Sequence, residues 1–171
     1  MTGTSWLICR RLPEDECRPE RNNMNYLIEG AVGPGLISEI MEAMAARKDC
    51  GGHSAFMGQV RADNIDGKIV KAIEYSAYEA MVRTEAEQIK AEILAEFEDA
   101  KSIEILHSTG TVMAGEISLF VLVSAGHRRQ AIEACSKSVE LIKERLPVWK
   151  KEIFDDDSHA WRENNPYQSG I

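Results

Sequence analysis

The amino-acid sequence predicts an α+β domain with a mainly antiparallel sheet and three main helices. Three long segments repeat apolar residues at intervals of three and four, which is typical of helices with one buried side. The segments between them are short apolar or alternating runs, as expected for strands, and some follow one another through Gly- or Asp-containing turns. Helices packed on a mainly antiparallel sheet make an α+β domain.

The chain is long enough for one domain with its own core. It has 171 residues, of which 44% are hydrophobic. Residues 1–23 mix Arg, Glu, Pro and Asn without an apolar period, so we expect a disordered N-terminal extension there. The domain itself is predicted over residues 24–163, and residues 164–171 are predicted to form a polar C-terminal tail.

The first half of the domain is predicted to contain three strands and two helices. In order, these are a strand at 25–30, a helix at 36–47, strands at 51–61 and 68–78, and a helix at 79–98. Pro34 and Gly35 lead into the first helix, and the stretch "ADNIDGK" between the later strands has the Asp-Gly chemistry of a turn. The apolar sides of the two helices carry Leu36, Ile37, Ile40, Met41 and Met44, and Val82, Ala86, Ile89, Ile93 and Phe97.

The second half is predicted to contain two strands, a third helix and a last extended segment. These fall at 102–110, 116–126, 129–146 and 148–154. A Gly-containing connection suggests that the two strands form an antiparallel pair, and Pro147 ends the helix because proline cannot continue its hydrogen-bond ladder. The apolar face of this helix is expected to be Ile132, Cys135, Val139, Ile142 and Leu146. Trp149 is expected to pack and to hold Lys150 in a fixed direction, and the acidic run 155–157 to open a polar tail.

The charge balance argues against two classes of partner. The chain has 20 Lys and Arg against 28 Asp and Glu, a formal charge of −8, so broad attraction to nucleic acid or to an anionic membrane is not expected. No apolar run approaches the roughly 18 residues that a spanning helix needs. We therefore expect a soluble cytoplasmic protein in which any anion site is local.

Neither a metal site nor a disulfide framework is predicted. The cysteines are scattered without a CxxC pair, and three of the histidines have no paired-ligand spacing. These residues are Cys9, Cys17, Cys50, Cys135, His53, His107 and His159. Because Cys135 lies on the apolar face of the last helix, we expect it to be a buried thiol without a chemical role.

Basic residues follow directly on the apolar strand at 116–126. His127 and Arg128 stand where a helix begins, and the free backbone N–H groups and the dipole of a helix start favour an anion such as a phosphate or a carboxylate. The alternative is that His127 ends the strand and Arg128 and Arg129 lie in solvent. This segment alone leaves both interpretations open.

Further basic residues stand at other segment ends. Lys143 lies near the end of the last helix, Lys150 and Lys151 follow it, and Arg61 follows the run "FMGQV". Each also has a simple structural explanation. Lys143 could complement the helix dipole, Lys150 and Lys151 could form a charged strand edge, and Arg61 could open a turn.

Four motifs, in this order and at these intervals, resemble the catalytic (large) subunit family of molybdopterin synthase. They are "AFMGQVRADN", "EYSAYEAM", "SAGHRRQAIEAC" and "LIKERLPVWKKE", and the similarity runs over residues 25–163. The resemblance implies an α/β hammerhead-like fold with an additional antiparallel sheet. It also implies a sulfurtransferase of molybdenum cofactor biosynthesis, which forms the molybdopterin dithiolene from cyclic pyranopterin monophosphate.

In this family the two sulfur atoms come from a partner. The donor is the thiocarboxylated C-terminal Gly-Gly tail of a small ubiquitin-like subunit. The implied assembly is a heterotetramer, in which a homodimer of large subunits carries one small subunit at each end. Since sulfur arrives on the partner, the resemblance implies no cofactor and no reactive thiol in this chain.

The resemblance also assigns site residues. Lys143 and Lys150 match the two catalytic lysines, while Phe56 matches an aromatic position to which we give only a packing role. The implied substrate contacts are Gln59, Val60, Arg61, His127, Arg128, Lys143, Lys150, Lys151 and Glu152. One feature departs from the family, in which a neighbouring subunit often supplies an arginine shortly after a tryptophan; here Trp161 is followed by Asn164 and Asn165.

Two other functions are compatible with the same basic residues. A noncatalytic module could bind a phosphorylated metabolite or an acidic tail without turnover. A hydrolase could open a cyclic phosphate without any sulfur donor. Product formation with a thiocarboxylated partner distinguishes the sulfurtransferase from both.

Overall fold

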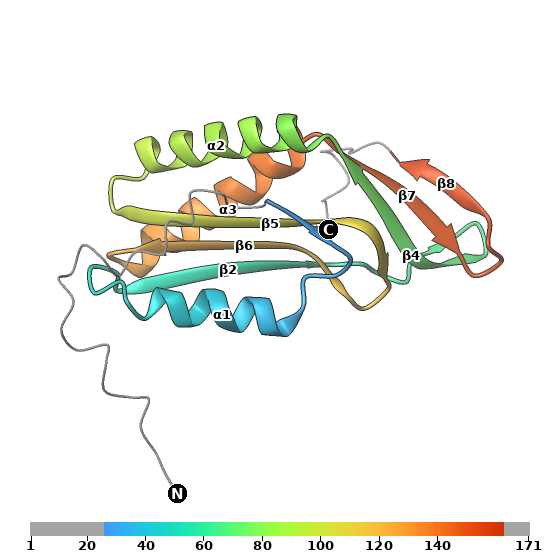
Figure 1. The fold of residues 1–171 in the computed structure, drawn as a ribbon, viewed down its shortest axis with the longest axis horizontal. Coiled ribbons are helices and arrows are strands. Elements are labelled where there is room, and N and C mark those ends of the chain that lie inside the picture. Colours follow the sequence, from blue (N-terminus) through green and yellow to red (C-terminus); the bar gives the residue numbers. More distant parts are fainter. Residues whose placement is uncertain (1–25, 163–171) are drawn as a thin grey trace, which may run out of the picture.

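The computed structural model describes residues 26–162, so the predicted extension at 1–23 and tail at 164–171 lie outside the described residues. The elements are β1 (Leu27–Glu29), α1 (Pro34–Met44), β2 (Gly52–Gln59), β3 (Asn64–Ile65), β4 (Lys68–Ala77), α2 (Glu79–Glu96), β5 (Ala100–Met113), β6 (Ile117–Ala125), α3 (Arg128–Arg145), β7 (Val148–Phe154) and β8 (His159–Arg162). Figure 1 shows the helices lying against one mainly antiparallel sheet, which confirms the α+β prediction.

The strands follow the order β2-β6-β5-β4-β7-β8, with β1 beside β5 and β3 beside β4. The pairs are antiparallel except β1 with β5, which is parallel. The predicted antiparallel pair of strands before the last helix is confirmed as β5 and β6. In this order β2 lies at one edge of the sheet and β8 at the other.

Strand β5 joins two parts of the sheet. Its residues 100–107 pair with β6, and its residues 110–113 pair with β4. Gly110, the first residue of the second stretch, has a φ of +71°, which glycine adopts without the steric cost of a Cβ. In Figure 1 β5 curves toward one end, and β4, β7 and β8 project from the rest of the sheet. We call these three strands the arm.

The helices cover the two faces of the sheet unequally. Helices α2 and α3 cover the face that carries Ile103, Ile105 and Val121, and this is the larger core. Helix α1 lies on the opposite face over Leu106 and Phe120. Because both faces are covered, β6 is buried along almost its whole length, which explains why its sequence reads as a continuous apolar run.

The segment after β7 differs from the prediction. The acidic run 155–157 does not open a tail but forms a turn that returns the chain into β8. Its carboxylates pair with lysines of β4: Lys68 lies 2.8 Å from Asp156, and Lys71 pairs with Asp157. The three aspartates are exposed, as their polarity suggested, but they belong to a hairpin and not to a tail.

Two predictions about apolar side chains are wrong. Ile132 is 58% exposed, although it was expected on the buried face of α3. That face is made largely of small residues such as Ala131, Ala134 and Ser138, which allow close approach to the sheet and leave Ile132 outside. Trp149 is 52% exposed and does not anchor the strand by burial.

Within residues 26–162, none of the helices is long and apolar enough to span a bilayer.

Candidate active site

Lys143 lies in the last turn of α3, above an aromatic ring of β2. Its Nζ is 5.7 Å from the centre of the Phe56 ring, a distance at which a ring face attracts an ammonium group. The helix end is held against α2 because Arg145 donates hydrogen bonds to Glu85 and Glu92 at 2.7 and 2.6 Å. Helix α3 therefore presents this ammonium group at a defined place beside β2.

Lys150 lies on β7 directly opposite Tyr75 of β4. Cross-strand partners project from the same face, and Tyr75 packs against the core that α2 and α3 cover. Lys150 therefore lies on the same side of the sheet as Lys143. Glu152, two residues further along β7, shares this face. Burial is the main cause that raises the pKa of Tyr75, and the charge of Glu152 adds to it.

A chain of hydrogen bonds connects Tyr75 to the end of β2. The Tyr75 hydroxyl donates to Ser118 Oγ at 3.1 Å, and Ser118 donates to the carbonyl oxygen of Gly58 at 3.4 Å. The Tyr75 ring also meets the His107 ring edge-on, with 5.2 Å between centroids. Burial lowers the pKa of His107, so a neutral imidazole packs there at pH 7. These contacts tie the arm to the rest of the sheet.

The predicted contact segment 59–61 begins at an irregularity of β2, where the pairing with β6 shifts register. Val60 is buried, and its backbone exchanges hydrogen bonds with the connection between β5 and β6 at 2.9 and 2.8 Å. The Arg61 side chain is 80% exposed and pairs with Asp63 at 3.0 Å. Phe56 precedes the segment 59–61 by only a few residues, and its ring lies under Lys143. The segment therefore lies toward the same end of α3 as Lys143.

Lys151 faces away from its neighbour Lys150 because side chains alternate along a strand. Its Nζ lies 2.6 Å from the Glu74 carboxylate and 5.7 Å from the centre of the Trp161 ring. A contact between Lys151 and substrate would require this ion pair to open.

The start of α3 already holds an internal anion. The carboxylate of Asp99 accepts hydrogen bonds from the backbone N–H of His127 at 2.6 Å and from its ring Nδ1 at 2.9 Å. The hydrogen bond from the His127 side chain is the main cause that lowers the pKa of Asp99. Arg128 is exposed, and its Cα would lie 3.0 Å from a Cβ added to Gly52. The start of β2 is therefore packed closely against the start of α3.

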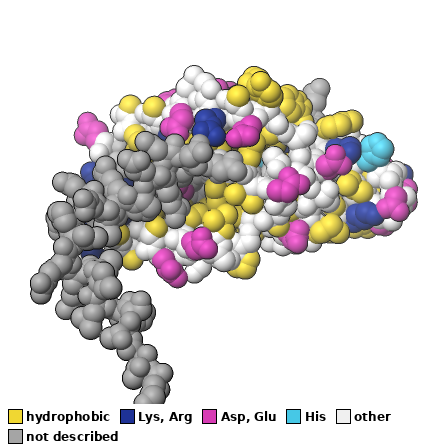
Figure 2. Space-filling view, viewed as in Figure 1, with side chains coloured by type: hydrophobic (Ala, Val, Ile, Leu, Met, Phe, Trp, Pro, Cys, Tyr) yellow, Lys and Arg dark blue, Asp and Glu magenta, His cyan; other side chains and the backbone are white. Residues whose placement is uncertain are grey.

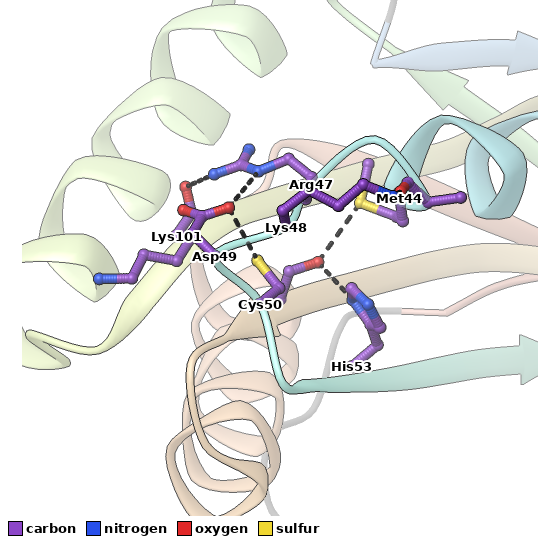
Figure 3. A network of polar contacts seen from close by, with 9 residues as sticks. Met44, Arg47, Lys48, Asp49, Cys50, His53 and Lys101 are labelled. Carbon is purple, nitrogen blue, oxygen red and sulfur yellow. Dashed lines mark hydrogen bonds and ion pairs between the residues drawn. The ribbon is translucent and has the colours of Figure 1, made fainter.

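Figure 3 shows how the chain before β2 is held at this end of the molecule. Arg47 donates a hydrogen bond to the backbone carbonyl of Lys101 at 3.2 Å and lies 3.5 Å from Asp49. The ring Nδ1 of His53 is 2.8 Å from Ser124 Oγ on β6. These bonds hold the start of β2 beside β5 and β6. The start of β2 is in turn packed against the start of α3.

The basic residues form two groups in one chain. Lys143, Lys150 and the segment 59–61 lie toward the end of α3, whereas His127 and Arg128 lie at its start. From 127 to 143 is 16 residues, which corresponds to about 24 Å along a helix with 1.5 Å rise per residue. A single chain therefore does not bring all the predicted contacts together.

Three residues that contact the two groups or their neighbours were not predicted from the sequence. Tyr75 carried a signal, since it lies in the motif "EYSAYEAM", but nothing in that motif indicated its partners. Ser118 looked like an ordinary strand residue. Asp99 is 28 residues from the His127 that it binds, and no local pattern predicts such a pair.

The chain as a whole carries more acidic than basic side chains. On the face shown in Figure 2, acidic side chains are spread over the surface and no broad basic area is visible. Among residues 26–162, no group of three or more His, Cys, Asp or Glu side chains could hold a metal ion. The described residues toward the end of α3 include Lys143 over the Phe56 ring, Lys150 and the partly buried Tyr75.

Comparison with known proteins gives consistent matches. The family model described as "MoaE protein" matches residues 34–145. The chain is 42% identical over 118 residues to a molybdopterin synthase catalytic subunit of Drosophila grimshawi, covering 68% of this chain and 32% of that protein. It is 42% identical over 123 residues to molybdopterin synthase catalytic subunit 1 of Aedes aegypti, covering 71% of this chain and 79% of that protein. The chain thus spans about a third of the Drosophila relatives and most of the mosquito one.

Solved structures share the fold. Molybdopterin synthase from Staphylococcus aureus superposes with a TM-score of 0.72 at 28% identity, covering 81% of this chain and 96% of that one. A complex of subunits 1 and 2 of molybdopterin-converting factor from Helicobacter pylori gives a TM-score of 0.67 at 22% identity, covering 80% of this chain and 88% of that one.

Proposed function

The chain belongs to the MoaE protein family, and from this membership we propose that it is the catalytic subunit of a cytoplasmic molybdopterin synthase. It would take two sulfur atoms, one from each of two thiocarboxylated C-terminal Gly-Gly tails of a small ubiquitin-like partner. It would add them to cyclic pyranopterin monophosphate and so form the molybdopterin dithiolene. The names of the relatives support this activity.

The observation that carries the proposal is the position of Lys143 and Lys150. They come from a helix and a strand and lie on the same side of the sheet, in a chain with a net charge of −8. The reaction must bring a phosphate ester and an anionic tail together. Two like charges 4 Å apart repel by about 1 to 4 kcal/mol, depending on the effective dielectric. Ammonium groups at the meeting point offset this repulsion.

The two lysines are given separate roles. The thiocarboxylate sulfur would add to a carbon of the pterin side chain, and water would then attack the thiocarboxylate carbon and release the tail as a carboxylate. Lys143 would stabilise the oxyanion that forms in this attack, or would move a proton there. Lys150 would polarise the substrate oxygen that leaves. Gln59, Val60 and Glu152 would contact the substrate from the segments that border the lysines, and Phe56 would limit access of water to one side of Lys143.

The residues proposed to bind the phosphate are too far apart to meet within one copy of the chain. Arg61 lies toward the same end of α3 as Lys143, whereas His127 and Arg128 are about 24 Å away along α3. We infer that the site is completed between two protomers, so that His127 and Arg128 of one copy meet the lysines of the other. In such an assembly the Asp99 carboxylate would keep the His127 side chain in place. The homodimer would carry one small subunit at each end.

Lysine substitutions test the proposal. Purified chain and thiocarboxylated partner would be mixed with cyclic pyranopterin monophosphate, and dithiolene formation followed in a single turnover. Lys143→Ala and Lys150→Ala are each expected to slow the reaction by about 100-fold or more, as for loss of a catalytic acid, base or oxyanion donor. Lys137→Ala, an exposed lysine on the same helix, should react like wild type.

Undiminished rates in both variants would remove the scheme. Tight uptake of the pterin without dithiolene product would instead identify a noncatalytic binding module. Opening of the cyclic phosphate in the absence of a sulfur donor would identify a hydrolase.

A further inference from the structure

The motif "EYSAYEAM" contains a partly buried tyrosine, Tyr75, that the sulfur-transfer scheme leaves without a role. We propose that Tyr75 is a positioning residue, which sets the place of Lys150 relative to the segment 59–61. The inference rests on the proposed function and adds to it a residue that acts through its neighbours and not on the substrate.

The first support is the place of Tyr75 between two strands. On one side it pairs with Lys150 of β7, and on the other it pairs with Gly110 of β5. The tyrosine ring lies against β5, where it meets the His107 ring edge-on with 5.2 Å between centroids. The ring is thus fixed on β5 while its cross-strand neighbour is a catalytic lysine.

The second support is the hydroxyl group. Through Ser118, which is 6% exposed, the Tyr75 hydroxyl is linked to the carbonyl oxygen of Gly58. Gly58 is the last residue before the register shift that begins the segment 59–61. A Cβ added there would lie 3.2 Å from both Leu119 Cβ and Phe56 Cε1, so this piece of backbone is packed against the ring that lies under Lys143.

Together these contacts connect both parts of the site. Strand β7, which carries Lys150, and β2, which leads into the segment 59–61, lie on different parts of the sheet and do not pair with each other. The link from the Tyr75 ring through its hydroxyl and Ser118 spans the two parts. Hydrogen bonds in such a partly buried chain strengthen one another, so loss of either donor should loosen the same connection.

The test removes the hydroxyl but keeps the ring. Tyr75→Phe leaves the contact with His107 and removes one hydrogen bond, and Ser118→Ala removes the middle of the chain. Each is expected to lower the maximal rate of dithiolene formation by about three- to tenfold, the range of one net hydrogen bond, while the KM for the thiocarboxylated partner stays unchanged. The double variant should be no slower than either single variant. Tyr78→Phe, an exposed tyrosine three residues further on, should react like wild type.

The outcomes separate the inference from the function that it rests on. All rates would be measured where urea unfolding shows each variant to be folded, so that a loss of stability alone does not change the rate. Wild-type rates in both Tyr75→Phe and Ser118→Ala, or independent losses that multiply in the double variant, would overturn the role of Tyr75. Wild-type protein that makes no dithiolene would overturn the proposed function itself.

Discussion

Replacement of Phe56 by leucine should weaken the contribution of Lys143 to the rate of dithiolene formation, although Lys143 itself is unchanged. The ammonium group lies 5.7 Å from the centre of this ring, close to the limit of about 6 Å for an attractive cation–ring contact. Leucine keeps an apolar side chain against the core but has no ring face. The expected result is a lower rate of dithiolene formation, and the decrease should occur only when Lys143 is present.

The size of the effect follows from the exposure of the pair. Lys143 is exposed, and contacts of this kind at exposed sites contribute about 0.5 to 1 kcal/mol. Since about 1.4 kcal/mol is a factor of ten, Phe56→Leu should slow single-turnover dithiolene formation about two- to fivefold. Phe56→Tyr keeps the ring and should retain the wild-type rate. Met57→Leu, on the next residue and the opposite face of β2, provides a matched control.

A double-mutant cycle decides whether the ring acts through the lysine. On the Lys143→Ala background, Phe56→Leu should cause no further loss, because the charge that the ring attracts is absent. If leucine slows the Lys143→Ala variant by the same factor as wild type, the ring acts on something other than this ammonium group and the reasoning is refuted.

Two further predictions concern the framework of the site. Gly67→Ala should lower the free energy of unfolding by about 1 to 2 kcal/mol, because φ is +84° there but the space is open. Gly110→Ala should cost more, because an added Cβ would also collide with the Glu29 carboxylate, and equal losses in urea unfolding would contradict this. For Asp99, a pKa lowered in the folded state means that its stabilisation is present at neutral pH and is lost as the pH falls through that lowered value. The difference in Tm between wild type and Asp99→Asn should therefore be largest near neutral pH and shrink below the ordinary pKa of 3.8. A difference that does not change with pH would show that His127 does not hold the Asp99 carboxylate ionised.

Local patterns in the sequence were sufficient for most elements. The apolar repeats located α1, α2 and α3, and Pro147 marked the end of the last helix, because periodicity and proline act within a few residues of themselves. The motifs that resemble the molybdopterin synthase catalytic subunits led to a family that the comparisons confirm. The acidic run 155–157 was misread because its partners Lys68 and Lys71 lie far back in the chain, on β4.

The amino-acid sequence by itself determined which residues are basic, which segments are helical and which family the chain belongs to. Only the tertiary structure decided how these residues are grouped. It placed Lys143 over Phe56 and Lys150 beside Tyr75, and it left His127 bound to Asp99 at the other end of α3. The physical reason is that the period of a helix or strand fixes where a side chain points from its own element, whereas neighbours from different elements depend on sheet order and register, which no local pattern specifies.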